Sequence, residues 1–462
     1  MVDSLLRLVP SRQKLYDSSP RLVRRVLVNL EARRRDWFRR YGDYASEVKR
    51  YDPAWYSNSP AAQEAYQCER LNTLVRAART NVPYYREALP DVPVTSIGDL
   101  RSLPLLEKRS IREAPLRFVA DGLPLRDLWR NTTSGSTGTP LVYYHDRSIT
   151  RAHQAVADAL LGSHGCLFGD RKVRISGAYV VPYEQTTPPF WVLIDRYRQL
   201  QCSAYHFAPD ACRYYLAAMR KAKVTHGTGY ASAWHLLASY VLESGDEPPT
   251  LRAIFTDSEG ITLDQQAAVE RAFQCPVFQT YGTGETGHVA MQCRSKRYHV
   301  LTRSCIAEVL DDSGTPVPDG ISGEIVVTDI TGLKTPFIRY RTGDLAAPAP
   351  NDCKCGWRSP SWLEIVGRVD DYVVTPEGRK VGRLSHVTKP GIGIAESQIA
   401  QVSPDEVVIR VVPDNGFDPQ SMFLVLDAAH RYLGNSVRVS WEKVDRLPRM
   451  KSGKLRHVVR EC

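Results

Sequence analysis

A loop rich in serine, threonine and glycine, TTSGSTGTP at residues 132–140, is the first candidate for chemistry. Its glycines let the backbone turn closely around an anion, and successive N–H groups and hydroxyls can donate hydrogen bonds to phosphate oxygens. The G-x-x-x-x-G-K-[ST] pattern of P-loop proteins is not found in the chain. Residues 141–144 are typical of a strand, so the loop is expected to join strands. Alone, such a loop is as often a plain surface turn.

Two further segments place a carboxylate beside a glycine turn. TYGTGET at residues 280–286 follows an apolar stretch and combines an aromatic ring with glycines and Glu285. Such a set can stack a base and coordinate Mg²⁺ from one loop. In YRTGD at residues 340–344, Asp344 is suited to accept hydrogen bonds from a ribose diol. Either segment alone is better explained as an ordinary turn or hairpin.

Two charged segments lie towards the C-terminal end. GRVDD at residues 367–371 is a glycine-containing junction, and LPRMKSGKLR at residues 447–456 is basic. A lysine beside a glycine on an extended loop is a mobile point charge that can reach a reacting phosphate or carboxylate. A basic tail is normally only solvated, so this segment alone indicates little.

Taken in order, these five segments resemble the acyl-activating superfamily of acyl-CoA synthetases, peptide-synthetase adenylation domains and luciferases. Within it the chain looks most like the phenylacetate–CoA-ligase-like branch, which includes capsule-biosynthesis homologues. NVPYYRE at residues 81–87 and TDSEG at residues 256–260 add to the resemblance, which covers nearly the whole chain. It implies that ATP activates a carboxylic acid as an acyl-AMP with release of pyrophosphate. The acyl group would then pass to a thiol of CoA or of a carrier protein.

Each motif takes a role from this resemblance. The family's phosphate loop, which holds the β- and γ-phosphates of ATP, maps onto Thr133, Ser134, Gly135, Ser136, Thr137 and Gly138. The family's adenine-facing turn and base-stacking loop map onto Ser258, Glu259, Gly260, Thr280, Tyr281, Gly282 and Thr283. Tyr281 would stack on adenine, and Asp344 would bind the ribose hydroxyls.

The resemblance also implies the catalytic residues Lys454, Glu285 and Arg368. Glu285 would hold Mg²⁺, and Arg368 would lie on the ribose or phosphate. Lys454 would bridge the substrate carboxylate and the α-phosphate, where it and Mg²⁺ offset the repulsion between two anions. Asp370 would be the hinge about which the C-terminal domain rotates between the half-reactions.

The chain departs from the family pattern at two positions. Leu141 follows Pro140 where many members have lysine, an absence familiar in the phenylacetate-ligase-like branch. Gly284 replaces the threonine usual before the metal-binding glutamate, which puts one hydroxyl contact to the nucleotide in doubt.

A zinc site is indicated by Cys293-x₅-His299 and the Cys353-Lys354-Cys355 pair. Three thiolates and an imidazole form a tetrahedral set suited to structural Zn²⁺. The C-x-C spacing is tighter than usual and the pairs are far apart, so four unrelated side chains are an equal alternative. Similar cysteine pairs recur in the phenylacetate-ligase-like branch. The other cysteines considered are interpreted as core or incidental thiols: Cys68, Cys166, Cys202, Cys212 and Cys305.

The acid pocket is the least defined part of the site. The family binds the acid between the central sheet and the region before the adenine turn, which here suggests Tyr179, Tyr205, His206, His226 and Tyr230. Most tyrosines in such a run are simply core residues. Neither the acid nor the acceptor is identified. The runner-up is an amide- or ester-forming ligase that uses a small-molecule amine or hydroxyl, and a further alternative is a degenerate nucleotide-binding homologue.

The elements that position these motifs follow from hydrophobic periodicity. Helices are predicted at residues 210–221 and 231–243, the second stopped at Gly245, with strands at 251–255 and 275–278. After residue 300 the pattern becomes strand-rich, as at 307–310 and 323–329. We therefore predict an α/β fold: a large multi-layer domain with a β-rich subdomain over residues 1–369. A small, mobile α+β domain over residues 370–462 would carry the catalytic lysine.

Composition sets the remaining expectations. The 462 residues are 43% apolar with a net charge of +10, which suits a globular protein with anionic partners. Eight arginines in residues 21–40 alternate with Leu22, Val23, Val26, Leu27, Leu30 and Trp37, which predicts a packed helix with a basic outer face.

Membrane and nucleic-acid partners are less favoured, because the sequence lacks the features that each would require. Docking of that helix to a membrane or carrier is the less favoured interpretation. A nucleic-acid binder would need a recognisable module, and none is found. Neither a transmembrane segment nor a signal peptide is predicted, and the scattered cysteines favour a cytoplasmic setting. A homodimer is left open.

Overall fold

The structure is a computed structural model and describes residues 16–91, 93–132, 141–182, 185–207, 211–368, 372–376, 380–382, 384, 387–388, 392–434, 436–449 and 455–462. The side chains of residues 366–368, 372, 380–382 and 431–432 lie outside this description. Four predicted groups of site residues therefore lie wholly or partly outside it: the phosphate loop, Arg368, Asp370 and Lys454.

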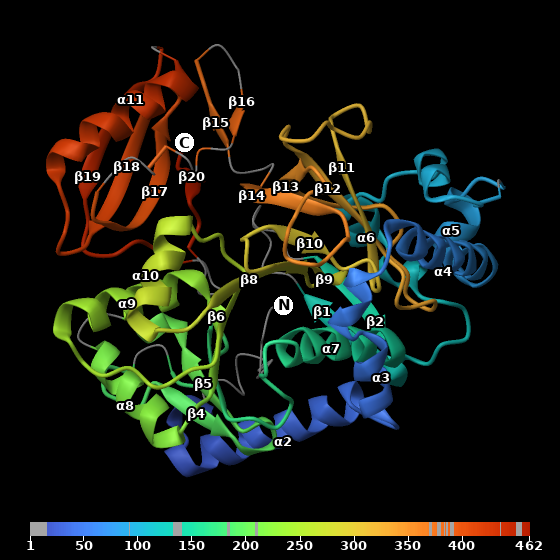
Figure 1. Cartoon of the computed structure of the whole chain (residues 1–462), viewed down its shortest axis with the longest axis horizontal. Helices are drawn as coiled ribbons and strands as arrows, with labels where there is room; N and C mark the ends of the chain where they lie inside the picture. Colours follow the sequence, from blue (N-terminus) through green and yellow to red (C-terminus); the bar gives the residue numbers. More distant parts are fainter. Residues whose placement is uncertain are drawn as a thin grey trace.

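The N-terminal part of the chain is largely helical. Its helices are α2 (Arg21–Arg39), α3 (Tyr44–Arg50), α4 (Pro60–Asn81), α5 (Pro83–Ala88) and α6 (Lys108–Glu113). Sequence explains where α4 begins, because the Ser59 side chain accepts a hydrogen bond from the N–H of Ala62 and Pro60 occupies the first turn. This part lies at the right of Figure 1, apart from α2, which runs along the bottom.

Strands and helices then alternate. The elements are β1 (Leu128–Thr132), β2 (Val142–Asp146), α7 (Arg147–Gly162), β3 (Lys172–Ser176), β4 (Trp191–Ile194), β5 (Gln199–Ser203), α8 (Cys212–Ala222), β6 (His226–Tyr230), α9 (Ala231–Ser244), β7 (Ile254–Asp257) and α10 (Leu263–Phe273). The two predicted helices correspond to α8 and α9, and α9 ends at Gly245 with a φ of 70°. The strand predicted at residues 251–255 begins three residues later.

The strand-rich region follows. It contains β8 (Val277–Thr283), β9 (Gly287–Gln292), β10 (Tyr298–Val300), β11 (Cys305–Leu310), β12 (Gly323–Asp329), β13 (Tyr340–Ala349) and β14 (Ser361–Arg368). Residues 323–329 form a strand with the predicted bounds, and those predicted at 307–310 form the end of β11. β8 begins two residues after the predicted start because Pro276 precedes it.

Among the described residues, the largest sheet has twelve strands in the order β11-β12-β13-β14-β10-β9-β8-β7-β6-β3-β5-β4. From β8 to β5 neighbouring strands are parallel, with α8, α9 and α10 packed beside them (Figure 1). From β8 to β11 neighbouring strands are antiparallel. The parallel half is the α/β unit and the antiparallel half the β-rich subdomain, so the predicted fold class is confirmed.

The C-terminal part forms a separate α+β layer at the upper left of Figure 1. It contains the hairpin β15 (Tyr372–Val374) and β16 (Lys380–Gly382), then β17 (Ile394–Ser403), β18 (Glu406–Pro413), α11 (Met422–Leu433), β19 (Arg438–Lys443) and β20 (Val458–Arg460). The sheet order is β19-β18-β17-β20, and α11 covers one face through an apolar cluster that includes Ile409, Val411 and Val425.

Helix α2 differs from its prediction. The helix forms, but Leu22, Leu30 and Trp37 are 75%, 54% and 65% exposed, so the apolar residues on which the prediction rested do not pack inwards. The buried residues are Val28, Ala32, Arg35, Asp36 and Phe38. Periodicity failed here because the inward face carries a buried arginine and aspartate. Among the described residues, no helix combines the length and hydropathy that a membrane crossing requires.

Candidate active site

The predicted nucleotide motifs meet at the carboxyl edge of the parallel strands. The turn at residues 258–260 follows β7, and β8 runs directly into the segment around Glu285. Ligands of open α/β sheets bind at this edge, because each strand leads there into a loop free to carry function. The hairpin of β1 and β2, paired in register from Leu128–Asp146 to Thr132–Val142, flanks the predicted phosphate loop, so that loop joins two strands as expected.

The turn after β7 is held in an uncommon conformation. Ser258 has a φ of 70°, a region that non-glycine residues seldom occupy, and its hydroxyl donates to Oδ1 of Asp257 over 2.9 Å. Asp257 also pairs with Arg174 of β3 at 2.8 Å. Burial alone would raise the pKa of Asp257, but the Arg174 guanidinium holds it well below its usual range, so the pair is ionised.

Glu259, the next residue, links this turn to two other parts of the chain. Oε2 accepts hydrogen bonds from the backbone N–H and hydroxyl of Ser232, at the start of α9, over 3.1 and 2.6 Å. Oε1 accepts one from the backbone N–H of Leu455 over 3.1 Å. Leu455 immediately follows Lys454, so the residue after the predicted catalytic lysine lies beside the predicted adenine-facing turn.

Arg449 makes a second contact from the C-terminal part. Its Nη1 donates to the Ser232 hydroxyl over 3.2 Å, and its guanidinium forms an ion pair with Glu396 of β17. Burial raises the pKa of Glu396, and the nearby Arg449 acts against that shift. Arg449 and Leu455, the residues that flank segment 450–454, are thus both held near the N-terminal end of α9, Arg449 directly and Leu455 through Glu259.

Tyr281 and Asp344 come from different predicted motifs and contact each other. The Tyr281 hydroxyl donates to Oδ2 of Asp344 over 2.9 Å and lies 3.3 Å from the hydroxyl of Thr342. The Tyr281 ring packs edge-on against Trp362 at 5.8 Å between centroids. Asp344 also stands opposite Arg368 in the β13–β14 register, so the backbone brings these two predicted residues together.

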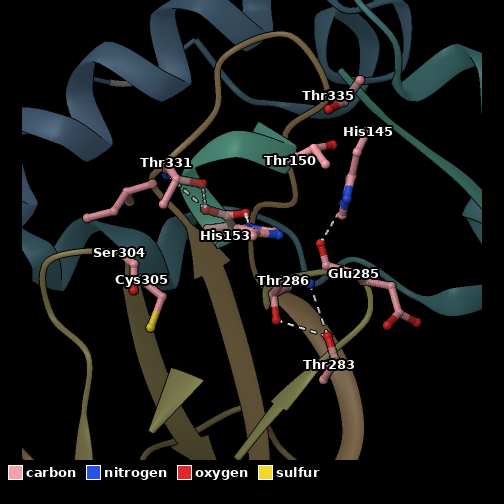
Figure 2. A network of polar contacts seen from close by, with 12 residues as sticks. His145, Thr150, His153, Thr283, Glu285, Thr286, Ser304, Cys305, Thr331 and Thr335 are labelled. Atoms are coloured by element: carbon pink, nitrogen blue, oxygen red, sulfur yellow. Dashed lines mark hydrogen bonds and ion pairs between the residues drawn. The ribbon is translucent and has the colours of Figure 1, made fainter. Parts of the chain in front are cut away.

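Glu285 is buried, with 5% of its surface exposed. Its Oε1 accepts a hydrogen bond from the hydroxyl of Tyr340 over 2.7 Å. Its backbone carbonyl accepts one from Nε2 of His145 over 2.9 Å, and the carboxylate points away from that imidazole (Figure 2). The turn is closed by Thr283, whose Oγ1 accepts from the N–H of Thr286 over 3.0 Å.

A pair of buried histidines, His145 and His153, lies next to this turn (Figure 2). The rings of His145 and His153 are 5.2 Å apart, and Nε2 of His153 lies 2.6 Å from Oδ2 of Asp329. Burial, with a smaller contribution from His153, lowers the pKa of His145 to about 3. His145 is therefore neutral near pH 7, and its Nε2–H is available to donate to the Glu285 carbonyl.

The glycine at position 284 has a structural cause. A Cβ at Gly284 would lie 2.5 Å from the Tyr143 hydroxyl of β2, which occupies the space of the missing side chain. The departure from the family threonine is thus paired with a tyrosine on a neighbouring element. Gly282 is required for a different reason, because a Cβ there would lie 2.2 Å from the carbonyl oxygen of Gly287.

Tyr143, His145 and Tyr340 were missed as site residues by sequence reasoning. Tyr143 and His145 are two residues apart on β2, which follows the phosphate loop, so their side chains lie on the same face of the strand. This spacing was the signal that could have identified them. Tyr340 is the first residue of the YRTGD motif, in which only the aspartate had been given a role.

The predicted zinc ligands come together. One ligand atom from each of Cys293, His299, Cys353 and Cys355 lies within 4.8 Å of all the others. The Sγ atoms of Cys293 and Cys353 are 3.7 Å apart, and Cys355 Sγ lies 3.3 Å from Nε2 of His299. Thiolates about 2.3 Å from a tetrahedral zinc ion are separated by about 3.8 Å, so the spacing fits. Nδ1 of His299 lies 3.2 Å from the Ser359 carbonyl, which leaves Nε2 for a metal.

Four of the five predicted acid-pocket residues, Tyr179, Tyr205, His206 and Tyr230, come at or just after the carboxyl ends of the parallel strands β3, β5 and β6. Tyr179 packs with Tyr16 and pairs with Asp17, while His206 stacks on Phe190. Tyr205 lies beside His206 in a 3-10 turn. His226 begins β6 and Tyr230 ends it, so they lie at opposite ends of one strand. Burial raises the pKa of Tyr230 and lowers that of His226 to about 4.

A cavity of about 150 Å³ lies elsewhere on the parallel half of the sheet. None of those five residues lines it, whereas Ser258, Thr280, Gly282 and Thr283 of the predicted nucleotide motifs do. Its other walls come from α2, α7 and the strands β3, β5 and β6. The cavity and the predicted nucleotide site are therefore contiguous.

Comparison with known proteins agrees with this architecture. Residues 131–333 match the AMP-binding enzyme family, and residues 373–461 match the CapK C-terminal domain. Protein CapK of Staphylococcus aureus is 23% identical over 96% of this chain and 98% of its own length. The phenylacetate-coenzyme A ligase of Thermus thermophilus is 26% identical over 67% of this chain and 71% of its own.

Among solved structures, a 2-hydroxyisobutyryl-CoA ligase bound to an acyl-AMP superposes with a TM-score of 0.66 at 20% identity. The superposition covers 88% of this chain and 91% of that one, which establishes a shared fold. Fold, motifs and relatives together define an AMP-forming ligase. The chain belongs to the adenylate-forming superfamily, in the branch that contains CapK and the phenylacetate–CoA ligases.

Proposed function

We propose that this protein activates a carboxylic acid with ATP, forming an acyl-AMP and releasing pyrophosphate, and then transfers the acyl group to a thiol. The observation that carries the proposal is the convergence of four motifs at one edge of the sheet. Asp344 is bonded to Tyr281, Glu285 is buried two residues after the end of β8, and Glu259 holds the residue that follows Lys454.

The proposed roles follow from this geometry. Asp344, already an acceptor for Tyr281, would accept the ribose hydroxyls, and Arg368 opposite it in register would face the ribose or phosphate. Ser258, Glu259 and Gly260 would border the adenine, next to Thr280 and Gly282. Thr133, Ser134, Gly135, Ser136, Thr137 and Gly138 would bind the β- and γ-phosphates.

The residues present fit a magnesium ion. Glu285 offers a buried carboxylate whose position is fixed through Oε1 by Tyr340, and the hydroxyls of Thr283 and Thr286 close the same turn. Hard oxygen ligands of this kind are what Mg²⁺ takes alongside nucleotide phosphates and water. When bound, the ion would neutralise charge on the reacting phosphates.

Lys454 would supply the mobile charge of the adenylation step. Its ammonium would meet the substrate carboxylate and the α-phosphate, where two anions must approach each other. We propose a division into residues 1–369 and 370–462, with Asp370 as the hinge that later withdraws the lysine loop. The match of residues 373–461 to a distinct C-terminal domain supports this division.

Two further points belong to the proposal. The cluster of Cys293, His299, Cys353 and Cys355 would hold one structural Zn²⁺, since it offers the thiolate and imidazole set that zinc prefers. The thiol acceptor is assigned as CoA because several relatives that align over two thirds of the chain are coenzyme A ligases. A carrier-protein thiol would use the same chemistry.

The test is acid-dependent exchange between ATP and labelled pyrophosphate, screened over a panel of carboxylic acids without CoA. An active acid is then incubated with ATP and CoA, and the product is identified by mass spectrometry. Exchange with at least one acid and an acyl-CoA product are expected. Nucleotide binding without exchange for any acid would instead identify a nucleotide-binding homologue, and exchange without a thioester would point to an amine or hydroxyl acceptor.

A further inference from the structure

The floor of the cavity is an unusual surface for a parallel sheet. Parallel strands are normally covered on both faces and apolar on both. In β3 and β5, the apolar residues Val173, Ile175, Leu200 and Cys202 all point into the hydrophobic core on one side of the sheet. The residues that alternate with them are polar or charged and line the cavity: Lys172, Arg174, Gln199 and Gln201.

The strand register makes this polar floor continuous. Lys172 stands beside Gln199, and Arg174 stands between Gln201 on one side and Thr228 of β6 on the other. Gln199 and Gln201 are buried and bonded to each other over 2.8 Å. The Gln201 amide also donates to the Ser176 hydroxyl and the Arg174 carbonyl, so these buried polar groups are satisfied within the protein and form a stable polar face that can border a polar occupant.

The wall opposite the floor adds positive charge. Helix α2 contributes Arg35 and Arg39, and Arg40 follows at its end, so five cationic side chains line the cavity against the two carboxylates Asp158 and Asp257. His288 also lines it, but burial lowers its pKa to about 4, and it is neutral near pH 7. We call this region, with Arg35, Arg39, Arg40, Lys172 and Arg174 in its lining, the basic cavity.

The carboxylates just outside the cavity do not fully neutralise the positive charge of its lining, because each of them pairs with two arginines. Asp36 pairs with both Arg40 and Arg196, at 2.7 and 2.5 Å. Glu31 pairs with both Arg34 and Arg35, at 2.8 and 2.9 Å. A concave site with excess positive charge and little water raises the local concentration of anions and strengthens their binding.

Resting on the proposed function, we propose that the basic cavity is the acid pocket and that the substrate carries a second anionic group, a carboxylate or a phosphate. The reacting carboxylate would face the end lined by Ser258, Gly282 and Thr283, next to the nucleotide. The second anion would be held at the other end by Lys172 of β3 and Arg39 of α2. An uncharged alkyl or aryl tail would form no ion pair with Lys172 or Arg39.

The test compares matched acids that differ only at the far end. Glutarate is compared with valerate, and 4-carboxyphenylacetate and 4-phosphooxyphenylacetate with 4-methylphenylacetate, in ATP–pyrophosphate exchange without CoA. The dianionic member of at least one pair is expected to have the higher kcat/KM, by about 10-fold or more. Leaving CoA out removes its phosphates as an explanation, and the KM for ATP reports whether the cations serve the nucleotide instead.

Variants locate the effect. Lys172→Gln and Arg39→Gln are expected to raise the KM for the dianionic acid about 10- to 100-fold while changing that of its uncharged-tail partner less than about 2-fold. Arg171→Gln is the matched control. Arg171 is the neighbour of Lys172 in the sequence, its side chain is exposed, and the substitution removes the same charge. An unchanged KM for ATP in all three variants would show that these cations bind the acid and not the nucleotide.

Contrary outcomes are distinguishable. If uncharged-tail acids are the better substrates and Lys172→Gln treats each pair alike, the pocket assignment is overturned while the ligase function stands. If no acid supports exchange, the proposed function fails, and calorimetric binding of glutarate and valerate decides the pocket separately. Equal binding of the two, unaffected by Lys172→Gln, overturns the second-anion site, and tighter glutarate binding that depends on Lys172 supports it.

Discussion

The backbone N–H of Leu455 donates a hydrogen bond to Oε1 of Glu259, 196 residues earlier in the chain, over 3.1 Å. The other oxygen of the same carboxylate holds the first turn of α9 through Ser232. One side chain therefore joins the C-terminal lysine loop to the turn that follows β7. We infer that Glu259 positions the loop for the adenylation step.

Replacing Glu259 with alanine should loosen this connection. Hydrogen bonds to a charged group contribute about 1.5–3 kcal/mol each, so Glu259→Ala should slow acid-dependent pyrophosphate exchange by about 10- to 100-fold. Amide hydrogen exchange in residues 455–460 should become faster in the same variant. Glu243→Ala, at the exposed end of α9, is the control and should change neither quantity. Wild-type exchange kinetics in Glu259→Ala would remove this residue from the account.

The motifs were predictable from sequence because each is a short run of residues with a defined chemistry. Contacts between motifs were not. Tyr281 meets Asp344 only because β8 and β13 belong to one sheet, with β9, β10 and β14 between them. The local pattern of either segment is equally compatible with an isolated turn. The order of the motifs along the chain allowed their roles to be assigned. The contact between Tyr281 and Asp344 is seen only in the folded chain.

The acid pocket shows the opposite case. The predicted residues were taken from the region where the family binds the acid, and in the structure Tyr179 packs with Tyr16 and His206 with Phe190. The alternation of Lys172, Arg174, Gln199 and Gln201 was visible in the sequence. It could not be interpreted without knowing that α2 and α7 cover that face, since polar alternation normally marks a strand face open to water.

The pairing of Gly284 with Tyr143 predicts a compensating pair of substitutions. A Cβ at position 284 would lie 2.5 Å from the Tyr143 hydroxyl but 3.6 Å from the ring carbon that carries it. Gly284→Ala should therefore cost about 1–3 kcal/mol of stability and reduce exchange activity, as overpacking does. Gly284→Ala with Tyr143→Phe should recover most of the loss, because 3.6 Å is an ordinary contact.

Thermal unfolding and exchange rates of the wild type, both single variants and the double variant form the cycle that measures this coupling. Tyr143→Phe alone should lose about 1 kcal/mol. Additive losses in the double variant would mean that the hydroxyl does not determine the residue at 284.

Zinc binding is tested by metal content. Purified protein should contain about one zinc ion per chain by plasma mass spectrometry, and Cys353→Ser should lose it together with thermal stability. Cys68→Ser removes a thiol that bonds the Thr95 carbonyl, far from the cluster in sequence, and should retain the metal. Metal-free wild-type protein with unchanged unfolding after chelation would show that the four side chains act only as packing.

The buried imidazole of His145 predicts a dependence of stability on pH. Burial lowers its pKa from 6.5 to about 3, so below about pH 6.5 the unfolded chain takes up a proton that the folded chain does not. The resulting stability is present above that pH and is lost as the pH falls. Between about pH 7.5 and about pH 5 the loss should be about 2 kcal/mol.

His145→Gln isolates this contribution, because glutamine keeps an N–H donor for the Glu285 carbonyl and does not titrate. Urea unfolding midpoints at about pH 7.5 and about pH 5 should shift less in the variant than in the wild type. His226 and His288, whose pKa values are also lowered to about 4, contribute equally to both proteins and cancel. Equal shifts in the two proteins would mean that His145 does not set the acid limit.

The most direct test of the account is acid-dependent ATP–pyrophosphate exchange by Lys454→Ala, compared with Lys451→Ala from the same loop. If Lys454 supplies the charge that joins the carboxylate to the α-phosphate, its loss should reduce exchange by about 100- to 1000-fold. Binding of ATP should be retained in both variants, and Lys451→Ala should keep most of the activity. Full exchange activity in Lys454→Ala, with an acid that the wild type uses, would contradict the central claim.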